Sequence, residues 1–139
     1  MNILEMCDSE AASVSVEATA EQAIRTMVDR HVGAVAVIDE NRRVAGIFTE
    51  RDVLCRLALG EHDPKTTSVR KMMTTPVEMA TRSTTAGEAL ATMVERHYRH
   101  LPIVDDDGRL LGMLSIRNVL QAQIDTLTRQ LDQARSIVL

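Results

Sequence analysis

The chain has 139 residues, 45% of them hydrophobic and 26% charged, with a formal net charge of −4, which is typical of a globular domain and not of a disordered chain. It has no basic tract, and Phe48 and Tyr98 are its only aromatic residues, so a surface that binds DNA or RNA is not expected. The apolar runs are far shorter than the ~18 residues of a membrane span, and the first residues lack a signal-peptide pattern. We therefore expect a cytoplasmic protein with no membrane partner.

Capping and apolar patterns in the first half predict two helices and three strands. Thr19 and Gln22 have the spacing of a capping box, and apolar residues at helical spacing follow them. Further on, two β-rich runs separated by polar turn residues predict a hairpin. In chain order, the expected elements are a strand at 14–16, a helix over 20–28, hairpin strands at 35–38 and 44–48, and a helix from Glu50.

The second half repeats this pattern after a shift of 66 residues. Residues 15–54 align without a gap on residues 81–120, and fourteen of the forty positions are identical. The shift predicts a helix capped by Thr85, a hairpin over 101–114 and a helix from Ile116, and a short strand is expected at 77–80.

The duplication predicts a fold built from two α/β repeats. One repeat of about 60 residues would bury only a small core, so we expect the two copies to pack sheet to sheet about a pseudo-twofold axis. The predicted boundaries are repeat 1 at 1–60, a linker at 61–68, repeat 2 at 69–124 and a C-terminal helical extension at 125–139.

One polar motif occurs at the same place in both repeats. After the hairpin, Thr49, Arg51 and Asp52 open a helix, and Ser115, Arg117 and Asn118 repeat them. One interpretation is helix capping alone. The other is a ligand site, in which the helix N-terminus, the hydroxyl and the guanidinium attract phosphate and the Asp accepts from ribose hydroxyls. Capping does not explain the arginine that both copies keep.

The order of elements, with Gly-x-x-Ser/Thr-x-x-Asp/Asn in both copies, resembles the cystathionine-β-synthase (CBS) domain. The resemblance covers residues 3–124 and has the form of a tandem pair, or Bateman module. It implies a βαββα fold for each repeat and a regulatory, non-enzymatic function that requires no cofactor. The implied ligand is an adenosyl compound (AMP, ADP or ATP, and less readily S-adenosylmethionine or NAD) in two clefts between the repeats.

The resemblance also assigns roles to residues of this chain. It implies that Asp52 and Asn118 hold ribose and that Thr49, Arg51, Ser115 and Arg117 face phosphate. The adenine is expected against the strand backbone near Ala34, Val35, His100, Leu101 and Pro102, with Thr75 and Val77 entering the second cleft.

The two predicted sites are not equivalent. The second repeat has Arg99 and His100 where the first has Gly33 and Ala34, and such a basic pair is suited to phosphate. Asn118 lacks the charge of Asp52. We therefore expect one good site at Asp52, aided by Arg99 and His100 across the cleft, and one weaker or empty site.

The four histidines and two cysteines form neither a metal-ligand spacing nor a nucleophile–base pair, so no metal site and no catalysis are expected. The C-terminal segment carries a heptad-like apolar pattern, at Leu120, Ile124, Leu127, Leu131, Ala134 and Val138. It predicts either a helix folded back on its own module or a contact within a homodimer.

Three functions remain open on the sequence. The preferred one is a sensor that binds an adenine nucleotide and modulates an unidentified partner protein. The second is a structural dimerisation or protein-interaction module without a small ligand. A nucleic-acid-associated regulator is the weakest, because the chain is acidic and poor in aromatic residues.

Overall fold

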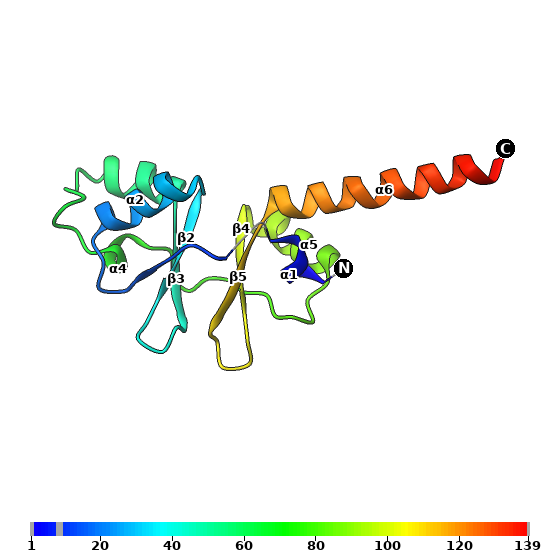
Figure 1. Cartoon of the computed structure of the whole chain (residues 1–139). Coiled ribbons are helices and arrows are strands. Elements are labelled where there is room, and N and C mark those ends of the chain that lie inside the picture. Colours follow the sequence, from blue (N-terminus) through cyan, green and yellow to red (C-terminus); the bar gives the residue numbers. More distant parts are fainter. Residues whose placement is uncertain (1, 8–9, 139) are drawn as a thin grey trace.

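The computed structural model describes residues 2–7 and 10–138, except for the Val138 side chain. The first half contains α1 (Ile3–Met6), β1 (Ser13–Ser15), α2 (Ala20–Arg30), β2 (Ala34–Ile38), β3 (Val44–Thr49) and α3 (Glu50–Asp52), which continues as the π-helical η1 (Val53–Ala58). The second half contains α4 (Val69–Met72), α5 (Ala86–Arg96), β4 (His100–Val104), β5 (Leu110–Ser115) and α6 (Ile116–Val138). Figure 1 shows the two halves side by side, with α6 extending from the second.

The strand register confirms the 66-residue duplication. Ala34 lies opposite Thr49 in the first hairpin, and His100 lies opposite Ser115 in the second. β1 runs parallel to β2. In the second half the strand expected at 77–80 is reduced to one parallel bridge, because only Ala80 exchanges backbone hydrogen bonds with β4.

α2 and α5, the equivalent helices of the two repeats, both begin at a threonine cap and end at a histidine cap. Thr19 and Gln22 form the expected capping box at the start of α2, and the Thr85 side chain accepts from the Glu88 N–H at the start of α5. Both helices end at a histidine in the left-handed conformation. These are His31 with φ 54° and His97 with φ 59°.

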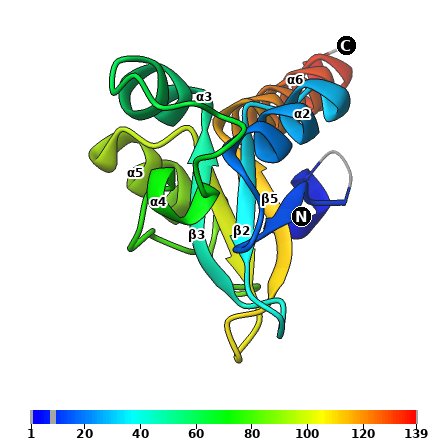
Figure 2. The same ribbon diagram turned by 90° about the vertical axis from the view of Figure 1, so that its left-hand side faces the viewer.

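The two hairpins meet about a local twofold axis. The Val44 N–H donates to the Gly108 carbonyl, the Leu110 N–H donates to the Arg42 carbonyl, and both N···O distances are 3.0 Å. Arg43 and Arg109, which are equivalent residues, form an antiparallel β-bridge through their backbones. This pairing confirms the pseudo-twofold symmetry. Both hairpin turns lie at the end of the molecule away from α2 and α6 (Figure 1 and Figure 2).

The two repeats exchange their short N-terminal helices. Ile3 of α1 is buried in the second core, with Met93 and Leu114, although α1 belongs to the first repeat. Val69 of α4 is buried in the first core with Phe48. Each core therefore requires a segment from beyond its own repeat, which ties the two repeats into one folding unit.

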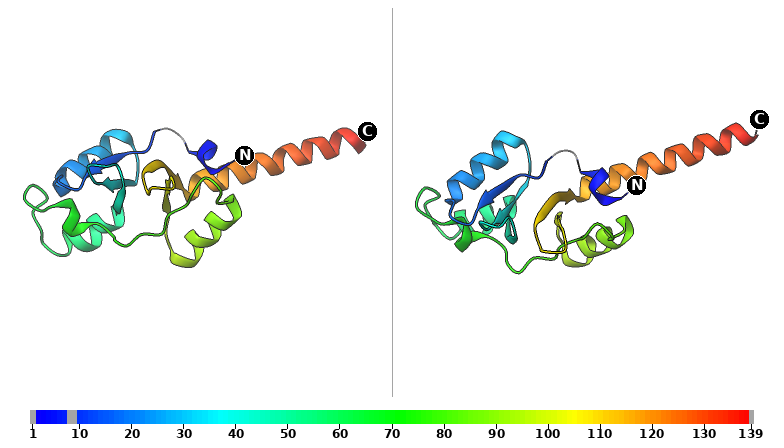
Figure 3. Two further views of the ribbon diagram at one scale, coloured as in Figure 1. Left: turned by 90° about the horizontal axis from the view of Figure 1, so that it is seen from below. Right: turned by 60° about the horizontal axis from the view of Figure 1, so that its bottom comes forward.

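α6 continues beyond the second repeat as a single helix of 23 residues, and Figure 3 shows it extending from the body. The structure therefore excludes a C-terminal helix that folds back on its own module. In the part of the chain that the structure describes, neither α6 nor any other helix has the length and apolar character needed to cross a membrane.

Candidate functional site

A cleft of about 750 Å³ lies between the two repeats. One wall is the end of β3 with α3 and η1, and the other is formed by the start of β4 and the junction of β5 with α6. The segment between the repeats contributes Thr74 and Val77. Small-molecule sites usually have volumes of roughly 300–1,000 Å³, so this cleft is large enough for a nucleotide.

Asp52 is the buried acid of this cleft, with only 5% of its surface exposed. Its Oδ2 accepts from the Thr49 N–H at 3.0 Å and from the Thr49 hydroxyl at 3.2 Å. In return, the Asp52 N–H donates to Thr49 Oγ1 at 3.3 Å. The capping interpretation is therefore right for the local structure, and the capping box fixes the carboxylate at the start of α3.

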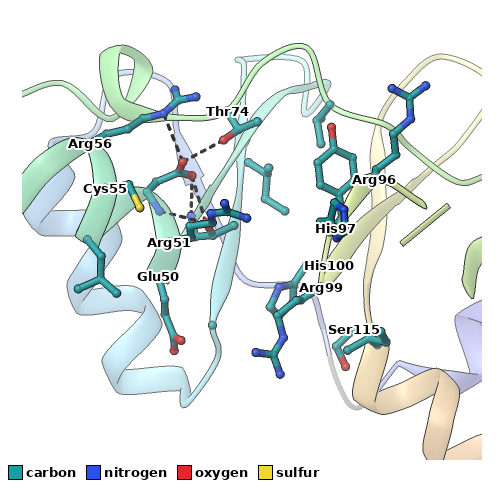
Figure 4. Close-up of a pocket in the computed structure, with 18 of the residues that line it drawn as sticks. Glu50, Arg51, Cys55, Arg56, Thr74, Arg96, His97, Arg99, His100 and Ser115 are labelled. Carbon is teal, nitrogen blue, oxygen red and sulfur yellow. Dashed lines mark hydrogen bonds and ion pairs between the residues drawn. The ribbon is translucent and has the colours of Figure 1, made fainter. Parts of the chain in front are cut away.

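Two further residues hold the other oxygen of Asp52, as the dashed lines in Figure 4 show. The Thr74 hydroxyl donates to Oδ1 at 2.9 Å, and Arg56 Nε lies 3.6 Å from the same oxygen. Arg56 also donates to the Met73 carbonyl at 2.8 Å. Asp52 is thus a positioned acceptor at the cleft, and a ligand hydroxyl would have to share or replace the Thr74 and Arg56 contacts.

The cleft is rich in positive charge. Five arginines and two carboxylates line it, and the arginines are Arg51, Arg56, Arg96, Arg99 and Arg117. Arg56 forms an ion pair with Asp52, and Arg96 forms one with Glu78, in which Nη2 lies 3.4 Å from Oε1. The guanidinium groups of Arg51 and Arg99 form no hydrogen bond or ion pair with any residue that the structure describes. These two guanidinium groups are therefore available to an anion.

His100 stands between the two repeats and lines the cleft (Figure 4). Burial lowers the pKa of His100 from 6.5; the Glu50 carboxylate acts in the opposite direction and Arg99 in the same one. A Cβ atom on Gly33 would lie 3.3 Å from both Glu50 Oε1 and His100 Cε1. The absence of a side chain at Gly33 therefore lets Glu50 and His100 approach each other across the junction.

This environment predicts a pH dependence of stability. The pKa of His100 is lower in the folded chain than in the unfolded chain. At a pH between these two pKa values, the unfolded chain therefore binds more protons than the folded chain. The His100 contribution to stability is present above pH 6.5 and is lost as the pH falls through the lowered folded pKa. Urea unfolding between pH 8 and about 5 is expected to show this loss in the wild type and a weaker loss in His100→Gln. Parallel curves for the two proteins would contradict the prediction.

A second, smaller cleft of about 210 Å³ lies at the equivalent place on the other side of the pseudo-twofold axis. There the Ser115 N–H donates to Asn118 Oδ1 at 3.0 Å, and the Asn118 N–H donates to Ser115 Oγ at 3.0 Å. This pair repeats the capping geometry of Thr49 and Asp52 without the negative charge. The cleft is below the usual size of a ligand site.

The structure brings most of the predicted site residues to the two clefts. Thr49, Arg51, Asp52, Val77 and Arg99 line the large cleft, Ala34 and Asn118 line the small one, and His100, Ser115 and Arg117 line both. Val77, which was expected to enter the second cleft, lines the cleft that contains Asp52.

Four predicted residues line neither cleft. Val35, Leu101 and Pro102 are buried, because the middle of β2 and of β4 is covered on both faces. The Thr75 hydroxyl donates to the Ala45 carbonyl at 3.0 Å. The side chains of these four residues are therefore not part of either cleft wall.

Sequence reasoning did not identify Arg56 and Thr74 as residues of the site. The duplication gives no signal for Arg56, because its equivalent is Ala122. A signal for Arg56 was available in its position four residues after Asp52, which is the spacing of an ion pair on a helix. Thr74 lies 22 residues from Asp52 in sequence, so only the fold brings the two together.

Comparison with known proteins agrees with this architecture. The sequence profile described as the CBS domain matches residues 3–59 and 69–125, and the chain therefore belongs to the CBS domain family. An uncharacterized 17.7 kDa protein of Acidianus ambivalens is 36% identical over 117 residues, which are 84% of this chain and 70% of that protein. The chain spans 63% of the length of an uncharacterized protein of Methanopyrus kandleri and 24% of the length of a CBS domain-containing protein of Arabidopsis thaliana.

Solved structures show the same fold. A CBS-domain-containing protein from Agrobacterium tumefaciens is 29% identical, with a TM-score of 0.77 over 88% of this chain and 92% of that one. A CBS domain protein from Pyrobaculum aerophilum complexed with AMP is 22% identical, with a TM-score of 0.78 over 85% of this chain and 89% of that one.

Proposed function

We propose that this chain is a regulatory module that binds an adenine nucleotide in the large cleft and thereby modulates a partner protein. The observation that carries the proposal is the pairing of one buried, positioned carboxylate with a wall of arginines inside a cleft of about 750 Å³. A nucleotide has the complementary chemistry, with a ribose diol for the carboxylate and phosphates for the arginines.

Each part of the cleft has a role in this proposal. Asp52 accepts from the ribose hydroxyls, and the Thr49 hydroxyl lies beside it. Arg51 and Arg99, whose guanidinium groups have no partner among the described residues, bind phosphate, and His100 lines the same cleft. AMP, ADP and ATP fit this charge, whereas S-adenosylmethionine lacks phosphate and fits it less well. The AMP complex of the Pyrobaculum protein supports the choice of ligand class.

The start of α6 offers a route from ligand to partner. Ser115 and Arg117 line both clefts, and α6 begins at Ile116 between them. A ligand that binds one orientation of this junction more tightly shifts the population toward it. The direction of the long helix then reports occupancy to the partner.

The second candidate function is a structural dimerisation module. Asp52 already has internal partners for both oxygens, and α6 presents exposed apolar residues. This alternative predicts no response to any nucleotide. It makes the large cleft a remnant without a ligand.

A thermal-unfolding panel with AMP, ADP, ATP and adenosine separates the two functions. A ligand at about 100 times its dissociation constant adds ~2.7 kcal/mol to the free energy of unfolding, so the midpoint is expected to rise with nucleotide concentration. Isothermal titration is expected to give one high-affinity site per chain, because the large cleft has the required size and the cleft at Asn118 does not. Unchanged midpoints, together with the absence of heat, would favour the structural module. Tripolyphosphate serves as the control for nonspecific anion binding.

A further inference from the structure

Five apolar residues of α6, from Leu120 to Ala134, form one continuous row. They are separated by alternating steps of four and three residues, which is the spacing of the a and d positions of a coiled coil. Ile124 and Leu131 occupy a positions, and Leu120, Leu127 and Ala134 occupy d positions. These five residues are called the α6 seam below.

The α6 seam lies on the side of the helix that faces away from the body. Val119 is fully buried in the second core, whereas Leu120, the next residue, is 47% exposed. Further along, Ile124 is 56%, Leu127 62% and Leu131 53% exposed. Figure 1 and Figure 3 show this part of α6 beyond the two repeats. The body therefore buries one face of the first turns and leaves the seam uncovered.

The charges of α6 are placed away from the seam. Asp125 and Asp132 take b positions and Arg129 takes an f position, all on the outer face. The flanking e and g positions are mostly uncharged, with Gln121, Gln123, Thr128 and Gln130. In a parallel pair, Arg135 of one copy faces Gln130 of the other. Two copies can therefore pair along the seam without like charges opposing each other.

The residue types along the seam indicate the partner. A β-branched residue at a, as at Ile124, with leucine at d, as at Leu120 and Leu127, favours a parallel two-stranded coiled coil. A seam of period 3.5 is complementary to another helix with the same period, and this chain supplies one in each copy. Exposed apolar faces of this kind mark interaction sites.

We infer that the α6 seam is a homodimer interface, in which two copies of this chain form a parallel two-stranded coiled coil. The 23 residues of α6 span about 34 Å, or three heptads. The parallel arrangement puts both pairs of repeats at the same end of the coiled coil. The residues of α6 that pack in the second core, Ile116 and Val119, both precede the seam, so this packing leaves the seam open to a second copy.

Sedimentation of the full-length chain tests the interface. Leu127→Glu introduces a charge into the seam, and Gln133→Glu introduces the same charge on the outer face as a matched control. The wild type and Gln133→Glu are expected to sediment as dimers at micromolar concentration, and Leu127→Glu at the monomer mass of 15.4 kDa. Leu127 packs in neither core, so circular dichroism is expected to show the repeats still folded. A monomeric wild type, or a Leu127→Glu variant that remains fully dimeric, would overturn the inference.

Oxidative cross-linking tests the orientation. Ala134→Cys places two thiols opposite each other only when the helices are parallel, so a covalent dimer is expected under mild oxidation. The parent chain, with Cys7 and Cys55, measures cross-linking through the native thiols. A yield no higher than that of the parent would overturn the parallel arrangement. None of these measurements involves a nucleotide, so they stand or fail independently of the proposed ligand.

Discussion

Replacing Asp52 by asparagine is expected to weaken AMP and ATP binding at least tenfold while the fold is kept. The second repeat provides the reason, because Asn118 occupies the equivalent position and still accepts from the Ser115 N–H at 3.0 Å. Asparagine therefore satisfies the capping geometry but lacks the charge that strengthens a hydrogen bond from ribose. Hydrogen bonds to charged groups contribute about 1.5–3 kcal/mol, which corresponds to tenfold or more in affinity. Isothermal titration measures the loss.

Asp52→Ala separates the structural role of this residue from its binding role. The alanine leaves the Thr49 N–H, the Thr74 hydroxyl and Arg56 without their common acceptor. An unsatisfied buried polar group costs about 1–3 kcal/mol, so urea unfolding is expected to show a loss of this order that Asp52→Asn largely avoids. Asp29→Asn, an exposed position on α2, is the matched control. If Asp52→Asn binds AMP and ATP with wild-type affinity, Asp52 has only the capping role.

Replacing Arg99 by glutamine is expected to lower the affinity for ATP about tenfold and to leave the affinity for adenosine nearly unchanged. Arg99 lines the large cleft, and its guanidinium forms no hydrogen bond or ion pair with the described residues, so the substitution removes none of these interactions. The difference arises because only ATP carries the phosphates that a guanidinium binds.

Salt provides a second measurement of the same interaction. Added salt screens exposed charges, so the difference in ATP affinity between the wild type and Arg99→Gln is expected to shrink as salt is raised. Arg82→Gln, an exposed arginine outside both clefts, controls for net charge. An equal loss for ATP and adenosine, or no loss for either, would remove Arg99 from the proposed phosphate site.

Local patterns predicted the elements of this protein well where the signal lies within a few residues. Thr19 and Gln22 identified the start of α2, and the shift of 66 residues reproduced the hairpin register of the second repeat. The strand expected at 77–80 was wrong in extent. The alternation of residues in a strand could not tell which parts of β2 and β4 reach a cleft, because both strands are buried on both faces. Val35 and Leu101 were assigned to the site through the family resemblance, and neither lines a cleft.

The amino-acid sequence by itself determined the duplication, the two capped motifs and the heptad spacing of α6, because each of these depends on residues close together in the chain or on a constant shift between two copies. Only the tertiary structure decided that α1 and α4 are exchanged between the cores, that Thr74 reaches Asp52, and that one cleft is much larger than the other. These features depend on how two similar halves pack. A difference such as Gly33 in one repeat and Arg99 at the equivalent position of the other changes a cleft only when the halves face each other.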